Sequence, residues 1–82
     1  MTTLCDLALG APALVRGYAP GCEHALALMQ LGLVPGTRVQ VVRAAPLGDP
    51  LEVDVAGARL ALRKAACREV QVEPLAPAAV TA

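Results

Sequence analysis

Hydrophobic and polar residues alternate over short stretches of this chain, as in strands that bury only one face. The alternation is regular in residues 51–55, where three hydrophobic residues are separated by two acidic ones. It recurs, less regularly, in residues 38–43, 59–63 and 69–73. Residues 13–18 form a fifth stretch, which ends before turn-forming residues. The pattern therefore predicts five short antiparallel strands, each with one face in water.

Two of these strands are expected to form a hairpin. Ala56 and Gly57 have the length of a two-residue hairpin turn. With that turn, hydrophobic residues face one another on the inner side and opposite charges meet on the outer side. The predicted pairs are Leu51 with Leu62, Val53 with Leu60, Asp54 with Arg59, and Val55 with Ala58. A slip of one residue would turn the hydrophobic side chains outward, so the register is well specified.

Residues 22–32 have the features of a helix. Leu28 and Leu31 are three residues apart on one side, and Gly32 follows as a helix end. A short helical turn is expected near the N-terminus, and another at residues 64–68 before the last strand. Five short strands are too few for two sheets but can curl into a small barrel. The predicted fold is mainly β, a five-stranded barrel with one helix and a short N-terminal helical turn.

The chain has 82 residues, which is enough for one domain. We assign residues 1–75 to this domain and expect residues 76–82 to form a flexible C-terminal tail. Tyr18 is the only aromatic residue, so the core must be built from Leu, Val and Ala. Because 56% of the residues are hydrophobic, we expect some apolar surface to stay exposed for a partner or for self-association.

Composition and charge exclude several classes of function. Seven basic and seven acidic residues cancel, and aromatic stacking residues are missing, which argues against nucleic-acid binding. No apolar run is long enough to insert into a membrane. The three scattered cysteines favour a reducing cytosol, with Cys5 and Cys67 expected as small buried hydrophobic residues, or alternatively as redox sensors. With no serine and a single histidine, we expect no enzyme.

Cys22, Glu23 and His24 stand together at the predicted start of the helix and are candidate metal ligands. A thiolate and an imidazole suit zinc, and a carboxylate can add a third ligand. Consecutive residues on a regular helix point in directions about 100° apart, however, which is a poor arrangement for one ion. The trio is therefore interpreted either as an ordinary helix start or as a site for a divalent metal, Zn(II) or Fe(II). We expect that the protein requires no cofactor for its function.

Three segments together resemble the FeoA family. The matching residues are Leu28, Leu31, Gly32, Leu33, Pro35 and Gly36 at the helix end, Pro46, Gly48, Asp49 and Pro50 in a hairpin loop, and Leu62, Arg63 and Lys64 before the last strand. The order and spacing of the three segments are more specific than any one of them. The chain departs from the family at Ala25, Leu26 and Ala27, where FeoA helices commonly carry Lys or Arg.

The resemblance implies an SH3-like barrel and a function in bacterial ferrous iron uptake. It implies a non-enzymatic, cytoplasmic accessory protein that binds and modulates FeoB, the membrane Fe(II) transporter, from the cytosolic side. We expect the docking surface near Leu26, Met29 and Leu33, with Arg43 at its edge, although the three apolar residues could equally belong to the core. The alternative is a homodimer that responds to a divalent metal held by Cys22 and His24 of neighbouring subunits.

Overall fold

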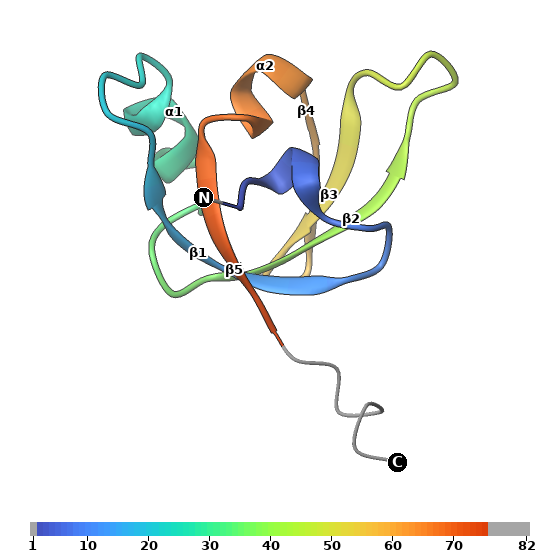
Figure 1. The fold of residues 1–82 in the computed structure, drawn as a ribbon, viewed down its shortest axis with the longest axis horizontal. Coiled ribbons are helices and arrows are strands. Elements are labelled where there is room, and N and C mark those ends of the chain that lie inside the picture. Colours follow the sequence, from blue (N-terminus) through green and yellow to red (C-terminus); the bar gives the residue numbers. More distant parts are fainter. Residues whose placement is uncertain (1, 76–82) are drawn as a thin grey trace.

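The structure is a computed structural model that describes residues 2–75; the expected tail at residues 76–82 lies outside the described residues. Five strands, two short α-helices and one 3-10 turn follow one another along the chain (Figure 1). In order they are η1 (Leu4–Asp6), β1 (Pro12–Tyr18), α1 (Ala25–Gln30), β2 (Arg38–Ala44), β3 (Leu51–Val55), β4 (Ala58–Leu62), α2 (Lys64–Cys67) and β5 (Val70–Pro74). The five expected strands and the N-terminal helical turn are confirmed. None of the described helices has the length and hydrophobicity needed to cross a membrane.

The strands form one antiparallel sheet with the order β4-β3-β2-β1-β5. The two edge strands, β4 and β5, are not paired with each other within residues 2–75, so the sheet curls without closing into a complete barrel. Helix α2 connects these two strands at one end of the molecule (Figure 1). The mainly β architecture is confirmed. The outer edge of β5 is partly covered by the N-terminal segment, since Val72 N–H donates to the Thr2 carbonyl oxygen and Thr3 forms a bridge with Gln71.

The hairpin of β3 and β4 has the register expected from the sequence. All four predicted pairs occur, and Asp54 lies opposite Arg59 on the outer face. Ala56 and Gly57 both have positive φ angles, 51° and 94°, as a two-residue hairpin turn requires. The Gly57 backbone N–H also donates a hydrogen bond of 2.8 Å to the Asp54 carboxylate, which stabilises the turn.

Within residues 2–75, fourteen hydrophobic side chains are buried in the core, and none of them is aromatic. The largest that are fully buried are Leu4, Leu33, Val15, Val39, Val41, Val53 and Val70. Tyr18 is only partly buried, and its hydroxyl donates a hydrogen bond to the Leu33 carbonyl oxygen. Valine and leucine side chains therefore fill the space inside the curled sheet, as the composition requires.

The helix expected at residues 22–32 is shorter than predicted. Helix α1 begins at Ala25, and Cys22 to His24 lie in the turn before it. No side chain caps the first turn of the helix. Instead, Gly21 adopts a positive φ of 77°, and Cys22 N–H donates to the Ala19 carbonyl, so that the chain turns back before helical dihedrals begin.

Leu33 is fully buried, so the expectation that it lies on a docking surface is wrong. Its exposed fraction is 0%, whereas Leu31, two residues earlier, is 51% exposed. Gly32, between them, has a φ of 106° and ends the helical geometry, which directs the following residue into the sheet interior. Of the matched family segment at the helix end, Leu28 and Leu33 therefore belong to the core.

This contrast predicts different stability effects for two leucines in the same turn. Leu33→Ala should lower the free energy of unfolding by about 2–5 kcal/mol, because it leaves a cavity in the core. Leu31→Ala should change it by no more than about 0.5 kcal/mol, because the side chain is largely in water. Urea denaturation followed by circular dichroism measures both, and equal effects would contradict the assignment of Leu33 to the core.

Candidate functional site

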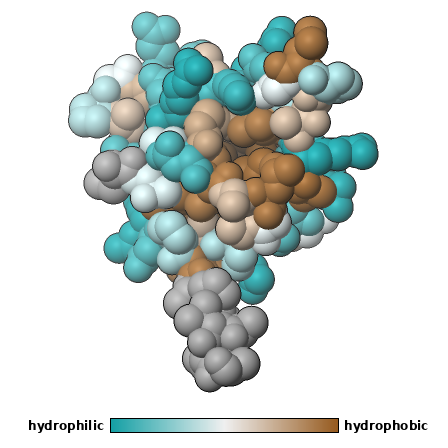
Figure 2. Space-filling view, turned by 45° about the vertical axis from the view of Figure 1, so that its right-hand side comes forward, coloured by the Kyte–Doolittle hydropathy of each residue, from teal (hydrophilic) through white to brown (hydrophobic). Residues whose placement is uncertain are grey.

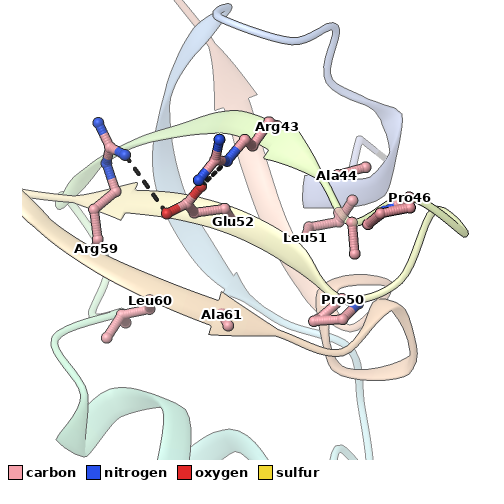
Figure 3. A pocket seen from close by; sticks show the side chains of 10 residues that line it. Arg43, Ala44, Pro46, Pro50, Leu51, Glu52, Arg59, Leu60 and Ala61 are labelled. Atoms are coloured by element: carbon pink, nitrogen blue, oxygen red, sulfur yellow. Dashed lines mark hydrogen bonds and ion pairs between the residues drawn. The ribbon is translucent and has the colours of Figure 1, made fainter.

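A pocket of about 650 Å³ lies over strands β2, β3 and β4. One end is apolar and is formed by Ala44, Pro46, Pro50 and Leu51, and the other end carries Arg43, Glu52 and Arg59 (Figure 3). Leu60 and Ala61 of the edge strand β4 complete the lining. On the face shown in Figure 2, hydrophobic surface gathers in the middle and hydrophilic residues surround it. The pocket thus offers both an apolar and a charged contact to a ligand.

A β-bulge in β2 places Arg43 at the charged end. The register of β2 against β3 shifts between Val41 and Arg43, so that Arg43 lies opposite Glu52. Val42 is the extra residue in this bulge, and an extra residue in a strand redirects the side chains that follow it. The same extra residue explains why the hydrophobic alternation of β2 is irregular in the sequence.

Ion pairs join the side chains at this end (Figure 3). Arg43 pairs with Glu52, and an Arg59 guanidinium nitrogen lies 3.6 Å from the other oxygen of the Glu52 carboxylate. Arg59 also approaches Asp54 at 3.7 Å. Arg43 remains 74% exposed in its side chain, so it can contact a further anionic group. Exposed pairs of this kind contribute little to stability. They can therefore be rearranged at small cost when a partner binds.

The β2–β3 loop borders the apolar end and is anchored at its base. The Asp49 carboxylate accepts a hydrogen bond of 2.9 Å from the backbone N–H of Lys64, the first residue of α2. Arg63 lies 3.9 Å from the same carboxylate. In contrast, Leu47 at the tip of the loop is 96% exposed. The loop therefore presents a free leucine from an anchored base.

The four residues expected on a docking surface lie in three different places. Leu26 on α1 is 69% exposed and Met29 is half-buried, whereas Leu33 belongs to the core. Arg43 lines the pocket, which neither Leu26 nor Met29 does. The expected surface is thus divided into an α1 surface, defined by Leu26 and Met29, and the pocket that includes Arg43.

A second group of functional side chains lies where the turn before α1 meets the start of β5. The Cys22 thiol donates a hydrogen bond of 3.3 Å to Glu69 Oε1, and His24 Nδ1 lies 3.0 Å from the same oxygen. One potential ligand atom from each of the three side chains lies within 4.8 Å of the others. Glu23, the remaining candidate ligand, is exposed and is not part of this cluster.

Backbone contacts hold the two segments of the cluster together. Ala19 N–H donates a hydrogen bond of 2.9 Å to the Glu69 carbonyl oxygen, at the end of the β1–β5 ladder. Hydrogen bonds from His24 and Cys22 lower the pKa of Glu69, while desolvation raises the pKa of Cys22. Glu69 is 45 residues from His24 in the sequence, and only the strand pairing brings the two together. No local signal marks Glu69 as a member of the site.

The other two cysteines have structural surroundings. Cys67 is fully buried, and burial raises its pKa to about 12. Cys5 is partly buried, and its thiol donates to the Lys64 carbonyl oxygen at 3.4 Å. Burial also raises the pKa of Cys5. Both thiols are therefore kept in the protonated, weakly reactive form.

Comparison with known proteins identifies relatives for nearly the whole described chain. Residues 2–74 match the FeoA domain family. The FeoA protein of Chlorobium tepidum is 39% identical, with a TM-score of 0.83 over 92% of this chain and 71% of that one. FeoA of Stenotrophomonas maltophilia, described as a prokaryotic SH3 domain protein and solved with zinc, is 34% identical, with a TM-score of 0.76 over 89% of this chain and 91% of that one.

A third relative is longer than this chain. Iron(II) transport protein A of Clostridium thermocellum is 31% identical, with a TM-score of 0.82 over 90% of this chain. The match spans only 46% of that protein, about half of its length. The expected SH3-like fold is confirmed by these likenesses, with the difference that the sheet is not closed between its edge strands.

The anchoring of the β2–β3 loop leads to a test at Asp49. Asp49→Ala removes the acceptor for the Lys64 N–H and should lower the free energy of unfolding by about 1 kcal/mol. That loss corresponds to a decrease in melting temperature of about 4–8 °C in a domain of this size. Asp49→Asn keeps an acceptor oxygen and removes the charge, so it should retain most of the stability. Thermal denaturation of both variants makes the comparison, and an equal loss in both would show that the charge, not the hydrogen bond, matters.

Proposed function

The chain belongs to the FeoA family, which is associated with ferrous iron transport, and from this membership we propose that it is a non-enzymatic accessory protein that binds a FeoB-type Fe(II) transporter. In this proposal it acts in the cytoplasm, on the cytosolic side of the transporter, and modulates uptake by binding. The small size of the domain and the pocket on its surface fit a binding module.

The pocket over β2, β3 and β4 is the observation that best supports binding to the transporter. Its apolar end can bury a hydrophobic side chain, and the exposed guanidinium of Arg43 can pair with a carboxylate. The pocket is therefore suited to a transporter segment in which an apolar residue lies close to an acidic one. Leu47, at the loop tip beside the apolar end, can add a further hydrophobic contact.

The α1 surface is the second place where the transporter could dock. Leu26 exposes most of its side chain there, and Met29 is a flexible neighbour that can adapt to a partner. We place the main contact in the pocket because, unlike the α1 surface, it combines a concave apolar surface with an available charge. The same binding measurement can separate the two surfaces.

The proposal is tested by the affinity of the full chain for the purified cytosolic part of the FeoB-type transporter from the same bacterium. Arg43→Glu should weaken binding about 10-fold or more, a loss of about 1.4 kcal/mol, because the contact to the transporter carboxylate becomes repulsive. Arg16→Glu is the matched control, since Arg16 is also exposed on a strand and paired with a glutamate, but lies outside the pocket. It should bind like the parent protein.

Leu26→Glu tests the α1 surface in the same assay. Its control is Leu9→Glu, because Leu9 is similarly exposed, at 63% against 69%, and lies outside α1. If only Leu26→Glu weakens binding, the α1 surface rather than the pocket is the docking site. If the parent protein does not bind the transporter at all, the proposed function is refuted. Circular dichroism of every variant confirms that a loss of affinity is not a loss of fold.

A further inference from the structure

Cys22, His24 and Glu69, the cluster beside the start of β5, belong neither to the hydrophobic core nor to the lining of the pocket. The cluster combines a thiol, an imidazole and a carboxylate, and His24 is the only histidine in the chain. From this arrangement we propose that Cys22, His24 and Glu69 bind one divalent transition metal ion, with zinc as the best match. The site lies within a single chain and is independent of the proposed binding to the transporter.

The distances in the cluster are close to those that an ion requires. Tetrahedral zinc holds sulfur, nitrogen and oxygen ligands at about 2.0–2.3 Å, which places the ligand atoms about 3.3–3.7 Å from one another. In the structure, the Glu69 oxygen is 3.3 Å from the Cys22 sulfur and 3.0 Å from His24 Nδ1, and all three ligand atoms lie within 4.8 Å. Movements of about 1 Å or less would bring the three atoms around one ion, which side-chain rotation can supply.

The fold holds these residues in place before any ion binds. Glu69 is fixed by the hydrogen bond from Ala19 to its carbonyl oxygen. Cys22 is fixed by its own hydrogen bond to the Ala19 carbonyl, at 3.1 Å, in a turn that depends on the positive φ of Gly21. One backbone residue, Ala19, therefore positions both sides of the cluster. Ligands that are held in this way lose less conformational entropy on binding.

The shorter helix removes the geometric objection to a metal site at this position. On a regular helix, Cys22 and His24 would point in directions about 200° apart. Because helix α1 begins only at Ala25, both side chains instead turn toward the same Glu69 oxygen. Glu69 replaces Glu23 as the carboxylate ligand.

The charge and proton changes on binding are balanced. Two hydrogen bonds now converge on the Glu69 carboxylate, one from the Cys22 thiol and one from the imidazole of His24. A divalent ion would take the place of both shared protons. The thiol proton is released to solvent, and the imidazole stays neutral because its proton moves from Nδ1 to Nε2, which leaves Nδ1 free to coordinate the ion. Thiolate, carboxylate and a 2+ ion then sum to zero charge, which suits a cluster on a chain with no net charge.

The ligand types decide which metals fit. Thiolate and imidazole favour Zn(II) and Co(II) over Mg(II) and Ca(II), which prefer oxygen ligands. Fe(II) is expected to bind more weakly than zinc at the same ligands, following the usual order of affinities. The side chain of His24 is 57% exposed, so a fourth position faces solvent and can be filled by water. The third protein ligand comes from the same chain, and a second subunit is not needed to complete the set.

The test is titration of the full, reduced chain with Co(II), followed by competition with Zn(II). One Co(II) per chain should bind, with the thiolate-to-cobalt charge-transfer absorption that reports a Cys–Co(II) bond, and Zn(II) should displace it. Cys22→Ser should abolish this absorption. Glu69→Gln keeps the shape and hydrogen-bonding capacity of the side chain, and should weaken metal binding about 10-fold or more.

Matched controls separate the cluster from nonspecific binding. Cys5→Ser removes a partly buried thiol outside the cluster, and Glu73→Gln removes an exposed carboxylate on β5, four residues after Glu69. Both should bind Co(II) like the parent protein. Absorption that survives Cys22→Ser, or affinity that Glu69→Gln leaves unchanged, would overturn the proposed ligand set.

Native mass decides whether the site lies in one chain. We expect a monomer with one ion bound in the presence of Zn(II). A Zn(II)-dependent dimer with one ion for every two chains would overturn the single-chain site, because the ion would then be shared between copies.

Discussion

The antiparallel pairing of β1 with β5 is the constraint on which the rest of the structure depends. It joins the beginning of the domain to its end, from Ala13 against Pro74 to Tyr18 against Val70. Without it, β5 would be a separate strand and the valine side chains of its inner face would lie in water. The pairing also brings Glu69 to the turn that contains Cys22 and His24. Because it links residues more than 50 positions apart, it must be formed against a large loss of chain entropy.

The features that the sequence predicted correctly are those that depend on neighbouring residues. The β3–β4 register follows from strict alternation around a two-residue turn, and every predicted pair is present. Two outcomes were missed although their causes are local. Helix α1 is shorter than expected because the turn at Gly21 delays its start, and Leu33 is buried because Gly32 directs it into the sheet interior. A distant contact decided the third outcome, since Glu69 could not be recognised as a neighbour of His24 before the strand pairing was known.

The irregular positions of the sequence proved informative in the structure. Val42 interrupts the alternation of β2, and the structure shows a bulge there that sets Arg43 against Glu52 at the end of the pocket. A residue that is out of step with the hydrophobic pattern is poorly explained by core packing, so it points to a surface role. Core packing does not explain Leu47 either, because a leucine that is 96% exposed does not stabilise the core.

Both candidate sites lie beside the two outer strands of the sheet, β4 and β5, which do not pair with each other in the part of the chain that the structure describes. The pocket is lined by Arg59, Leu60 and Ala61 of β4, and Glu69 directly precedes β5. In a fully closed barrel these two strands would pair, and the backbone of both edges would be covered. Here α2 connects them instead, and the loop at Asp49 is fixed to its first residue. An SH3-like sheet that stops short of closure can therefore keep a rigid core while its two outer strands border the pocket on one side and the cluster of Cys22, His24 and Glu69 on the other, where Thr2 and Thr3 cover part of the β5 edge.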